Sequence, residues 1–206
     1  MSLRAVQREY DALAGRYDQR WAGYVAASTA LAVARVSLAP AQRLLDVGCG
    51  TGVLLERLRA HDPDAQYVGV DATPGMLARA HARLGSDVLL IEASGEALPL
   101  PDQSVHAVVS TSALHYMADA PRALREMHRV LTPGGTLVLV DWCADFVAMR
   151  ALDLVLRVVD RAHERTRTTA QVRGLAAGAN FEHIHVSRHA IDRFWGLFVL
   201  TARATA

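Results

Sequence analysis

The sequence predicts an α/β protein in which helices cover both faces of a mostly parallel sheet and a C-terminal antiparallel hairpin extends it. Between residues 43 and 141, short apolar runs alternate with segments of helical periodicity. A glycine-rich turn directly follows the first apolar run, as in doubly wound nucleotide-binding folds. Residues 181–186 and 194–202 are two further strand-like segments, too close together for a crossover helix, so we expect them to pair antiparallel.

The N-terminal part predicts two helices, then a strand and a third helix. Residues 3–19 place apolar and aromatic side chains on one helical face. Residues 24–36 are dominated by alanine, a strong helix former, and Pro40 ends that region. The apolar run 43–47 predicts the first strand, and residues 51–60 predict the helix that follows it.

The next unit repeats this order of strand and helix. Residues 67–71 form a short apolar run that ends in an acid. Thr73 predicts an N-cap and Pro74 a first helical position, so a helix should run from there to about residue 84. Residues 88–91 predict the third strand, and the proline-containing segment 92–104 predicts a loop.

The remaining central elements follow the same logic. Residues 105–109 predict the fourth strand and residues 121–131 a helix, which the Pro-Gly-Gly run 133–135 should stop. Residues 136–140 predict the fifth strand, whose continuous apolar character fits burial on both faces. Residues 146–159 are strongly apolar with helical spacing.

The composition is that of a folded, nearly neutral protein. The 206 residues are enough for one domain, and 22 basic side chains almost balance 21 acidic ones. Without a basic cluster we expect no nucleic-acid partner. Cys49 and Cys143 suggest neither a disulfide framework nor a metal site, so we expect reduced thiols, no metal and a cytoplasmic location. No signal-peptide core occurs in residues 1–21, and no apolar run is long enough to span a membrane.

The most informative stretch is residues 44–52, which read LLDVGCGTG. Three alternating glycines after a buried strand let the backbone turn tightly and approach a ligand. A dinucleotide fingerprint would need a small residue at position 53, where the chain has Val53, so an NAD-dependent oxidoreductase is a disfavoured alternative. Asp71 follows Gly50 by 21 positions and ends the second strand, where a carboxylate can accept hydrogen bonds from ribose hydroxyls.

These motifs together resemble the class I S-adenosylmethionine-dependent methyltransferases, in particular the small-molecule branch related to the ubiquinone and menaquinone biosynthesis methyltransferases. The resemblance rests on the turn 46–52, on Asp71, on the loop 94–101, on the terminal hairpin and on a Y-D-x-x-A-x-x-Y-D element at residues 10–18. It implies a seven-stranded Rossmann-like sheet with one reversed strand. It also implies S-adenosylmethionine as cofactor and a small-molecule acceptor.

The resemblance also assigns cofactor contacts to particular residues. Asp46 is expected near the cofactor's amino group, Asp71 at the ribose, Met76 against the adenine and Tyr17 at the methionine carboxylate. The alternative for Asp46 is an acid that braces the turn or caps a helix, and for Asp71 a charge that offsets a helix dipole. Met76 and Tyr17 could instead be side chains of the hydrophobic core. The expected cofactor-binding residues are Tyr17, Asp46, Gly48, Cys49, Gly50, Gly52, Asp71, Ala72, Met76, Ser94, Gly95 and Ser110.

The loop that starts SGEALP at residue 94 departs from the family pattern G-D-A-E-x-L-P. Ser94 stands at the aspartate position and should bond the adenine amino group more weakly than a carboxylate would. Gly95 still supplies a backbone N–H, and Glu92 is a candidate to compensate. We expect Glu96 to brace the loop.

The catalytic candidate is His115, which follows the fourth strand in the segment STSALHY. Its pKa range suits proton removal from an acceptor, and the alternative is a structural histidine near the pocket. Asp141 and Trp142 follow the fifth strand and are candidates to orient the acceptor or line its site. The apolar residues 146–159 suggest a lid or a dimer face, and hence a hydrophobic or aromatic acceptor.

We therefore predict a single methyltransferase domain over residues 1–206. It would comprise an N-terminal helical lid at 1–36, a cofactor-binding core at 43–141, a helical insertion or lid at 144–180 and a hairpin at 181–203. The protein would act as a monomer or homodimer on a small molecule. Two alternatives stay open: a cofactor-binding protein without catalysis, and an RNA or protein methyltransferase.

Overall fold

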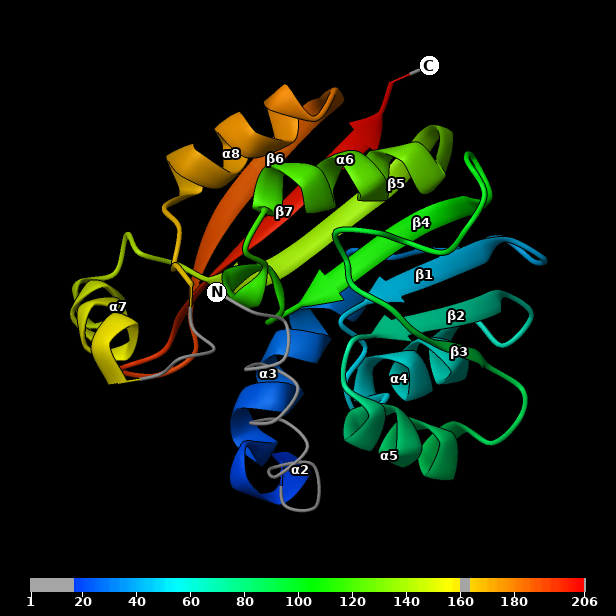
Figure 1. Cartoon of the computed structure of the whole chain (residues 1–206), viewed down its shortest axis with the longest axis horizontal. Helices are drawn as coiled ribbons and strands as arrows, with labels where there is room; N and C mark the ends of the chain where they lie inside the picture. Colours follow the sequence, from blue (N-terminus) through cyan, green and yellow to red (C-terminus); the bar gives the residue numbers. More distant parts are fainter. Residues whose placement is uncertain (1–16, 160–163, 206) are drawn as a thin grey trace.

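The computed structural model describes residues 17–159 and 164–205, which form one seven-stranded sheet with flanking helices (Figure 1). The strand order is β3-β2-β1-β4-β5-β7-β6, and β7 alone runs antiparallel to its two neighbours. The expected mixed sheet with one reversed strand is thereby confirmed. The strands are β1 (Arg43–Val47), β2 (Gln66–Asp71), β3 (Leu89–Glu92), β4 (Val105–Thr111), β5 (Leu131–Trp142), β6 (Phe181–Ala190) and β7 (Gly196–Ala204).

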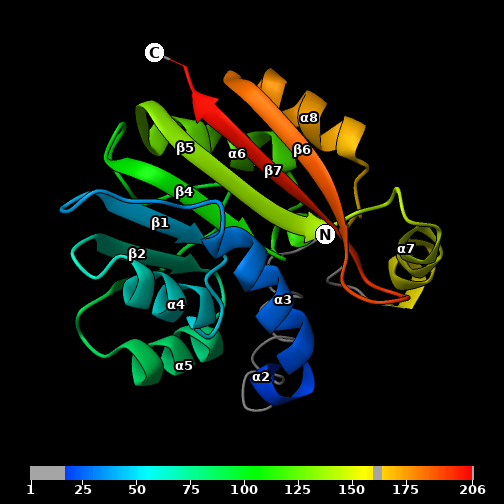
Figure 2. The same ribbon diagram turned by 180° about the vertical axis from the view of Figure 1, so that it is seen from behind.

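Helices lie on both faces of the sheet, so the described residues form two apolar cores (Figures 1 and 2). One core packs β-strand side chains against α6 and α8, and the other packs them against α3, α4 and α5. Two short elements, α2 and the 3-10 turn η1, lie near the carboxyl ends of the strands. The helical elements are α2 (Tyr17–Arg20), α3 (Ala22–Val33), α4 (Val53–His61), α5 (Pro74–Leu84), η1 (Leu114–Tyr116), α6 (Ala120–Val130), α7 (Val147–Val159) and α8 (Thr169–Gly178).

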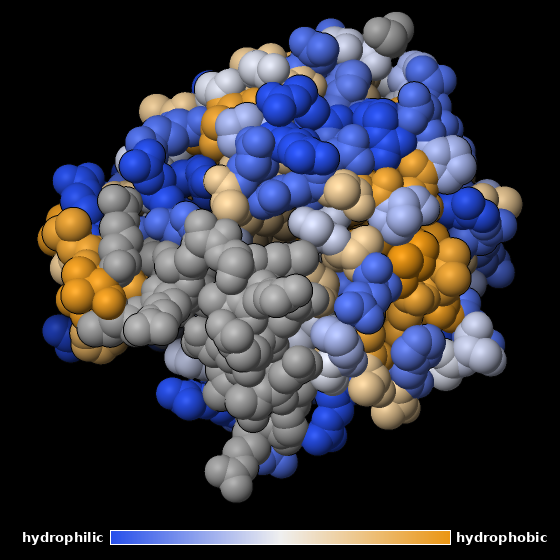
Figure 3. Space-filling view, in the orientation of Figure 1, coloured by the Kyte–Doolittle hydropathy of each residue, from blue (hydrophilic) through white to orange (hydrophobic). Residues whose placement is uncertain are grey.

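The helix α7 lies beyond the end of the sheet and exposes part of its apolar surface, which Figure 3 shows at the left edge. Val147 and Val158 are exposed, whereas Met149 is fully buried. The lid or dimer-face role expected for this segment stays a prediction. Among the described residues, no helix combines the length and the apolar character that crossing a membrane requires.

The element boundaries differ from the sequence prediction at a few places. Of the helix expected over 3–19, only the last three residues lie in the described part, within α2. β5 begins at Leu131, five residues before the expected start, because its pairing with β4 resumes after a register shift that accommodates the Pro-Gly-Gly run. Gly134 has a positive φ of 73° there, a conformation that glycine adopts without strain.

The helix α8 was expected only as part of a helical region. Its start carries a capping box in which the Thr168 side chain accepts from the backbone N–H of Gln171 and the Gln171 side chain accepts from that of Thr168. This local signal could have placed the helix from sequence.

Candidate functional site

The glycine turn connects β1 to α4 at the carboxyl edge of the sheet. Gly48, Gly50 and Gly52 have φ values of 76°, 53° and 80°, which other L-residues rarely adopt. A Cβ on Gly48 would lie 2.5 Å from the Ala113 Cβ, and one on Gly52 would lie 2.8 Å from Leu84 Cδ1. A Cβ on Gly50 would meet nothing within 4 Å. Two of the glycines therefore permit packing, while Gly50 presents bare backbone to open space.

A pocket of about 780 Å³, its open mouth included, lies beside this turn. Its walls come from the glycine turn and from the segments that follow β2, β3 and β4, so all of them stand at the carboxyl ends of strands. This is the position at which open α/β sheets bind ligands. The pocket is lined by Gly48, Gly50, Asp71, Ala72, Thr73, Met76, Ala93, Ser94, Gly95, Glu96, Thr111, Ser112, Ala113, Tyr116 and Met117.

Asp71 joins the two sides of this pocket. Its Oδ2 accepts a hydrogen bond from the Gly50 N–H at 2.9 Å, and its Oδ1 accepts one from the Thr73 N–H at 2.8 Å. Burial raises the pKa of Asp71, although these backbone donors act in the opposite direction. The carboxylate thus holds the glycine turn in place and presents negative charge to the pocket.

Asp46 lies behind the same turn and is 1% exposed. Neither carboxylate oxygen has a hydrogen-bond partner among the described residues. Burial, with a smaller effect from Asp71, raises the pKa of Asp46 to about 8. Burial and the two carboxylates also raise the pKa of the adjacent Cys49 thiol. The site therefore contains the buried Asp46 and the half-buried Asp71, and no salt bridge to Asp46 forms within the described residues, an arrangement that favours a cationic ligand.

The loop after β3 is held by side chains from itself and from α6. Ser94 Oγ accepts from the Glu96 N–H at 3.2 Å, and Glu96 Oε1 accepts from the Asp119 N–H at 3.0 Å. Glu96 thereby braces the loop. A Cβ on Gly95 would lie 2.8 Å from Met117 Cε and 2.9 Å from Val47 Cγ1, so the loop packs closely against its surroundings.

Arg129 on α6 fixes the next part of this loop, a role that no local sequence pattern predicted. Its Nη1 and Nη2 groups donate to the carbonyl oxygens of Leu100 and Leu98, each at 2.9 Å. Glu126, paired with Arg129, accepts from the Leu98 N–H at 2.9 Å. Two charged side chains thus satisfy the backbone of a segment that has no regular secondary structure.

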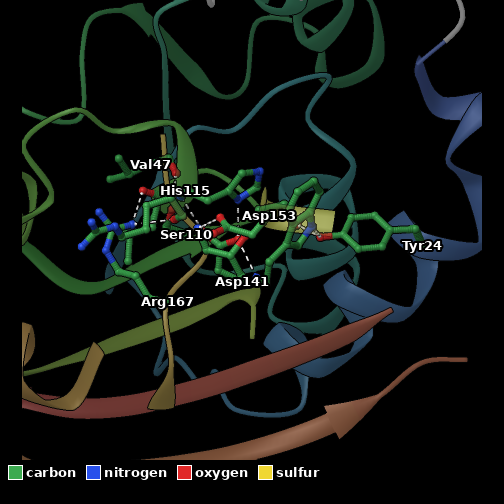
Figure 4. Close-up of polar contacts among 12 residues, drawn as sticks. Tyr24, Val47, Ser110, His115, Asp141, Asp153 and Arg167 are labelled. Carbon is green, nitrogen blue, oxygen red and sulfur yellow. Dashed lines mark hydrogen bonds and ion pairs between the residues drawn. The ribbon is translucent and has the colours of Figure 1, made fainter. Parts of the chain in front are cut away.

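The segment after β4 contains a strained residue at the pocket wall. Ser112 has a φ of 55°, unusual for a residue other than glycine. Its N–H donates to the Val140 carbonyl at 2.8 Å, and its Oγ lies 2.5 Å from the Tyr24 hydroxyl oxygen. Trp142 Nε1 donates to that same Tyr24 oxygen at 2.8 Å, so three segments distant in sequence meet here (Figure 4).

His115 and Asp141 form a buried pair beside this network (Figure 4). His115 Nδ1 lies 2.5 Å from Asp141 Oδ1, and the His115 backbone N–H donates to Asp141 Oδ2 at 3.1 Å. Asp141 Oδ1 also accepts from the Trp142 N–H at 2.7 Å. The imidazole stacks on the Trp142 ring with a centroid distance of 4.1 Å and an interplanar angle of 15°.

An aromatic cluster extends from this pair. The three tryptophans of the chain gather here: Trp195 lies with its ring centroid 5.9 Å from Trp21 and 5.1 Å from Trp142. Tyr24 lies 5.2 Å from Trp195. The carboxyl end of the sheet therefore carries both a polar pocket and a neighbouring aromatic surface.

The expected site residues fall into two groups. Ser110 donates its hydroxyl to the Val47 carbonyl, and His115 is buried next to the pocket. Tyr17 lies in α2, and its side chain is outside the described residues. Ser110 and His115, together with Asp46, Cys49 and Gly52, do not line the pocket, and their roles and that of Tyr17 stay predictions. The expected residues that do line it are Gly48, Gly50, Asp71, Ala72, Met76, Ser94 and Gly95.

Comparison with known proteins identifies the domain. Residues 45–139 match the family model of a methyltransferase domain. The demethylmenaquinone methyltransferase of Thermus thermophilus is 42% identical over 105 residues, which are 49% of this chain and 47% of the relative. That of Deinococcus radiodurans is 36% identical over 151 residues, 67% of this chain and 60% of the relative. The chain thus spans about half to three fifths of these relatives.

A solved structure agrees with the fold. A SAM-dependent methyltransferase from Thermotoga maritima superimposes with a TM-score of 0.77 at 21% identity, covering 97% of this chain and 99% of that one. The sheet order, the glycine turn and the family match lead to one assignment. Residues 45–139 therefore form a methyltransferase domain, and the family match together with the fold indicates S-adenosylmethionine as its cofactor.

Proposed function

We propose that this protein transfers the methyl group of S-adenosylmethionine to a small hydrophobic or aromatic acceptor. The observation that carries the proposal is the pocket in which bare glycine backbone lies beside the Asp71 carboxylate, with the buried Asp46 directly before the glycine turn. When bound, the cofactor supplies a sulfonium whose methyl group is already activated for displacement. The protein's contribution is then to hold the acceptor in line and to exclude water.

The residues present fit this cofactor. Asp71 has a carboxylate at the pocket wall that suits two ribose hydroxyls, and Gly95 offers close backbone approach at the adenine end. Met76 supplies an apolar contact for the base. Asp46, which has no partner among the described residues, would offset the positive charge of the amino acid portion. Because Ser94 is uncharged, recognition of the adenine would rely on backbone groups and on the shape of the pocket.

His115 is our candidate for the group that removes a proton from the acceptor. Asp141 accepts from two backbone N–H groups, so the short contact to His115 is a donation from Nδ1–H to the carboxylate. That tautomer leaves the basic lone pair on Nε2. Asp141 and the stacked Trp142 would then hold the imidazole in one orientation.

The aromatic cluster supports an aromatic or hydrophobic acceptor. Trp142, Trp195 and Tyr24 offer ring faces beside the wall formed by Ser112 and Tyr116. The demethylmenaquinone named for the relatives is a compound of this class. Both cysteines are buried free thiols, which supports the cytoplasmic location proposed for the chain.

Cofactor binding and turnover are tested separately. S-adenosylhomocysteine at about 100 times its Kd should stabilise the fold by about 2.7 kcal/mol, a Tm increase of roughly 5–10 °C, whereas NAD should leave Tm unchanged. Transfer of a labelled methyl group from the donor into a metabolite extract, followed by identification of the product, tests catalysis. Binding without any labelled product would favour the non-catalytic alternative.

The role of His115 is tested once an acceptor is known. His115→Asn should lower kcat by about 100-fold or more if the acceptor must lose a proton, with little change in cofactor affinity. The control is His81→Asn, which alters an exposed histidine on α5. An unchanged kcat in His115→Asn would assign that histidine to structure alone.

A further inference from the structure

A second groove lies on the other side of the segment that carries His115. It is formed where residues 164–167 and the start of α8 meet the beginning of α6. Met117 lines the cofactor pocket, while the next residue, Ala118, lines this groove. The groove is lined by Ala118, Pro121, Glu164, Arg165, Arg167, Gln171, Gly174 and Leu175.

Arg167 is held in this groove by carbonyl groups instead of by an acid. Its Nη1 donates to the Leu114 carbonyl at 3.0 Å and to the Arg165 carbonyl at 3.3 Å. No carboxylate forms a salt bridge with it within residues 17–159 and 164–205. A guanidinium has five N–H donors, so the donors on Nε and Nη2 have no protein acceptor among these residues.

Charged neighbours act on Arg167 in both directions, although no carboxylate among the described residues bonds to it directly. Burial is the main influence that lowers the pKa of Arg167, and Arg165 acts in the same direction. The charges of Asp141, Glu164 and Asp153 act in the opposite direction, and the groove itself is lined by two guanidinium groups and one carboxylate. A partly buried arginine is ordinarily paired with an acid, and a planar guanidinium fork matches the oxygens of a carboxylate or phosphate.

The groove is also directly connected to the candidate catalytic segment. The backbone N–H groups of Glu164 and Arg165 donate to the His115 carbonyl at 3.1 and 3.2 Å, and Arg167 bonds to the carbonyl of the preceding Leu114. Figure 4 shows Arg167 and Tyr24 on opposite sides of the His115–Asp141 pair. A ligand in the groove would therefore contact Arg165 and Arg167, which are themselves hydrogen-bonded to the turn that holds His115.

We propose that this groove is an oxyanion-binding site, in which Arg167 and Arg165 hold a carboxylate or phosphate group. The oxyanion supplies the counter-charge and the hydrogen-bond acceptors that Arg167 lacks within the described protein. Because Arg167 bonds to the carbonyl of Leu114 in the η1 turn, we assign the oxyanion to a substituent of the methyl acceptor, a point that rests on the proposed methyl transfer. Binding of the anion itself does not depend on that function.

The direct test is a thermal-shift titration of the full chain with inorganic phosphate and with acetate at constant ionic strength. The wild-type protein should show a saturable increase in Tm. Arg167→Gln should weaken the apparent affinity at least about tenfold and Arg165→Gln by a smaller factor, because a charge-assisted hydrogen bond is lost in each case. The control is Arg125→Gln, which removes an exposed charge on α6 outside the groove and should bind as the wild type does.

Several outcomes would overturn the proposal. One is a wild-type Tm that shows no saturable increase with phosphate or acetate. Another is a loss of anion affinity in Arg125→Gln as large as that in Arg167→Gln. The third is wild-type affinity in Arg167→Gln or in Arg165→Gln. Arg167→Lys guards against misfolding of the glutamine variant, since it keeps the charge and loses the fork. It should bind phosphate more weakly than the wild type, and equal affinity would exclude recognition by the guanidinium.

Two further titrations test whether the anion belongs to the methyl acceptor and whether the oxyanion site and the proposed methyl transfer can fail independently. Phenyl phosphate and benzoate should bind at least about tenfold more tightly than inorganic phosphate and acetate if the anion belongs to an aromatic acceptor. Equal affinities would overturn the acceptor assignment. S-adenosylhomocysteine should bind Arg167→Gln and wild type alike. If it binds neither protein while phosphate binds the wild type, the methyltransferase proposal fails and the oxyanion site stands.

Discussion

Replacing Asp46 by asparagine would change the pH dependence of folding in a defined direction. The carboxyl has a pKa of about 8 in the folded protein, against 3.8 for an aspartate free in water. Between these values the folded chain retains a proton that the unfolded chain has released. The free energy of unfolding must therefore fall as pH rises through this window and level off above about pH 8.

The size of the effect follows from proton linkage. One proton bound only in the folded state lowers the free energy of unfolding by about 1.4 kcal/mol per pH unit. From pH 5 to pH 8 the contribution of Asp46 amounts to about 4 kcal/mol, a substantial part of the 5–15 kcal/mol typical of a folded domain. Asparagine keeps the volume of the side chain and cannot ionise, so the variant lacks this slope.

Urea unfolding followed by far-UV circular dichroism at pH 5, 6, 7 and 8 measures the difference between Asp46→Asn and the wild type. The stability of the variant relative to the wild type should rise by about 4 kcal/mol across the series. Asp64→Asn, at an exposed acid, is the control and should show a constant difference. A pH-independent difference for Asp46→Asn would mean that burial does not raise the pKa of Asp46, and the description of this carboxyl as buried without a partner would fail.

Three further substitutions test the pocket. Asp71→Asn should abolish most of the Tm increase caused by S-adenosylhomocysteine and cost about 1–3 kcal/mol of stability, because two backbone donors lose a charged acceptor; retention of the full shift would contradict the ribose assignment. Gly95→Ala should weaken binding of that ligand in calorimetry, since its Cβ would crowd Met117, whereas Gly174→Ala, in an open part of α8, should bind normally and gain about 0.5–1 kcal/mol in urea unfolding. Arg129→Gln should lower the protection of backbone amides against hydrogen exchange in the loop that follows β3. Unaltered exchange at Leu98 and Leu100 would show that Arg129 does not hold this loop in place.

Local patterns were sufficient for the features that depend on short stretches of chain. The glycine turn could be recognised because its positive φ angles restrict residue choice at alternating positions. Asp71 could be placed at the pocket because the carboxyl ends of parallel strands share one edge of the sheet. The terminal hairpin followed from the short connection between β6 and β7.

Features built from distant residues could not be predicted in this way. The contact between Tyr24 and Ser112 spans 88 positions, and that between Tyr24 and Trp142 spans 118. Arg129 reaches loop carbonyls about 30 positions earlier. None of these pairs leaves a periodic or compositional signal, since each depends on how separate elements pack. The extended start of β5 was missed because a Pro-Gly-Gly run ordinarily ends pairing, whereas here a register shift accommodates it.

The gathering of all three tryptophans at one end of the sheet gives the protein a local optical probe. Its intrinsic emission originates beside Trp195, while the opposite edge formed by β3 contains none of the emitters. A spectral change therefore reports an event near the carboxyl end of β5 and the start of β7. Local unfolding of the β3 side would leave the tryptophan emission unchanged. The intrinsic fluorescence of this protein therefore reports on one region and not on the whole molecule.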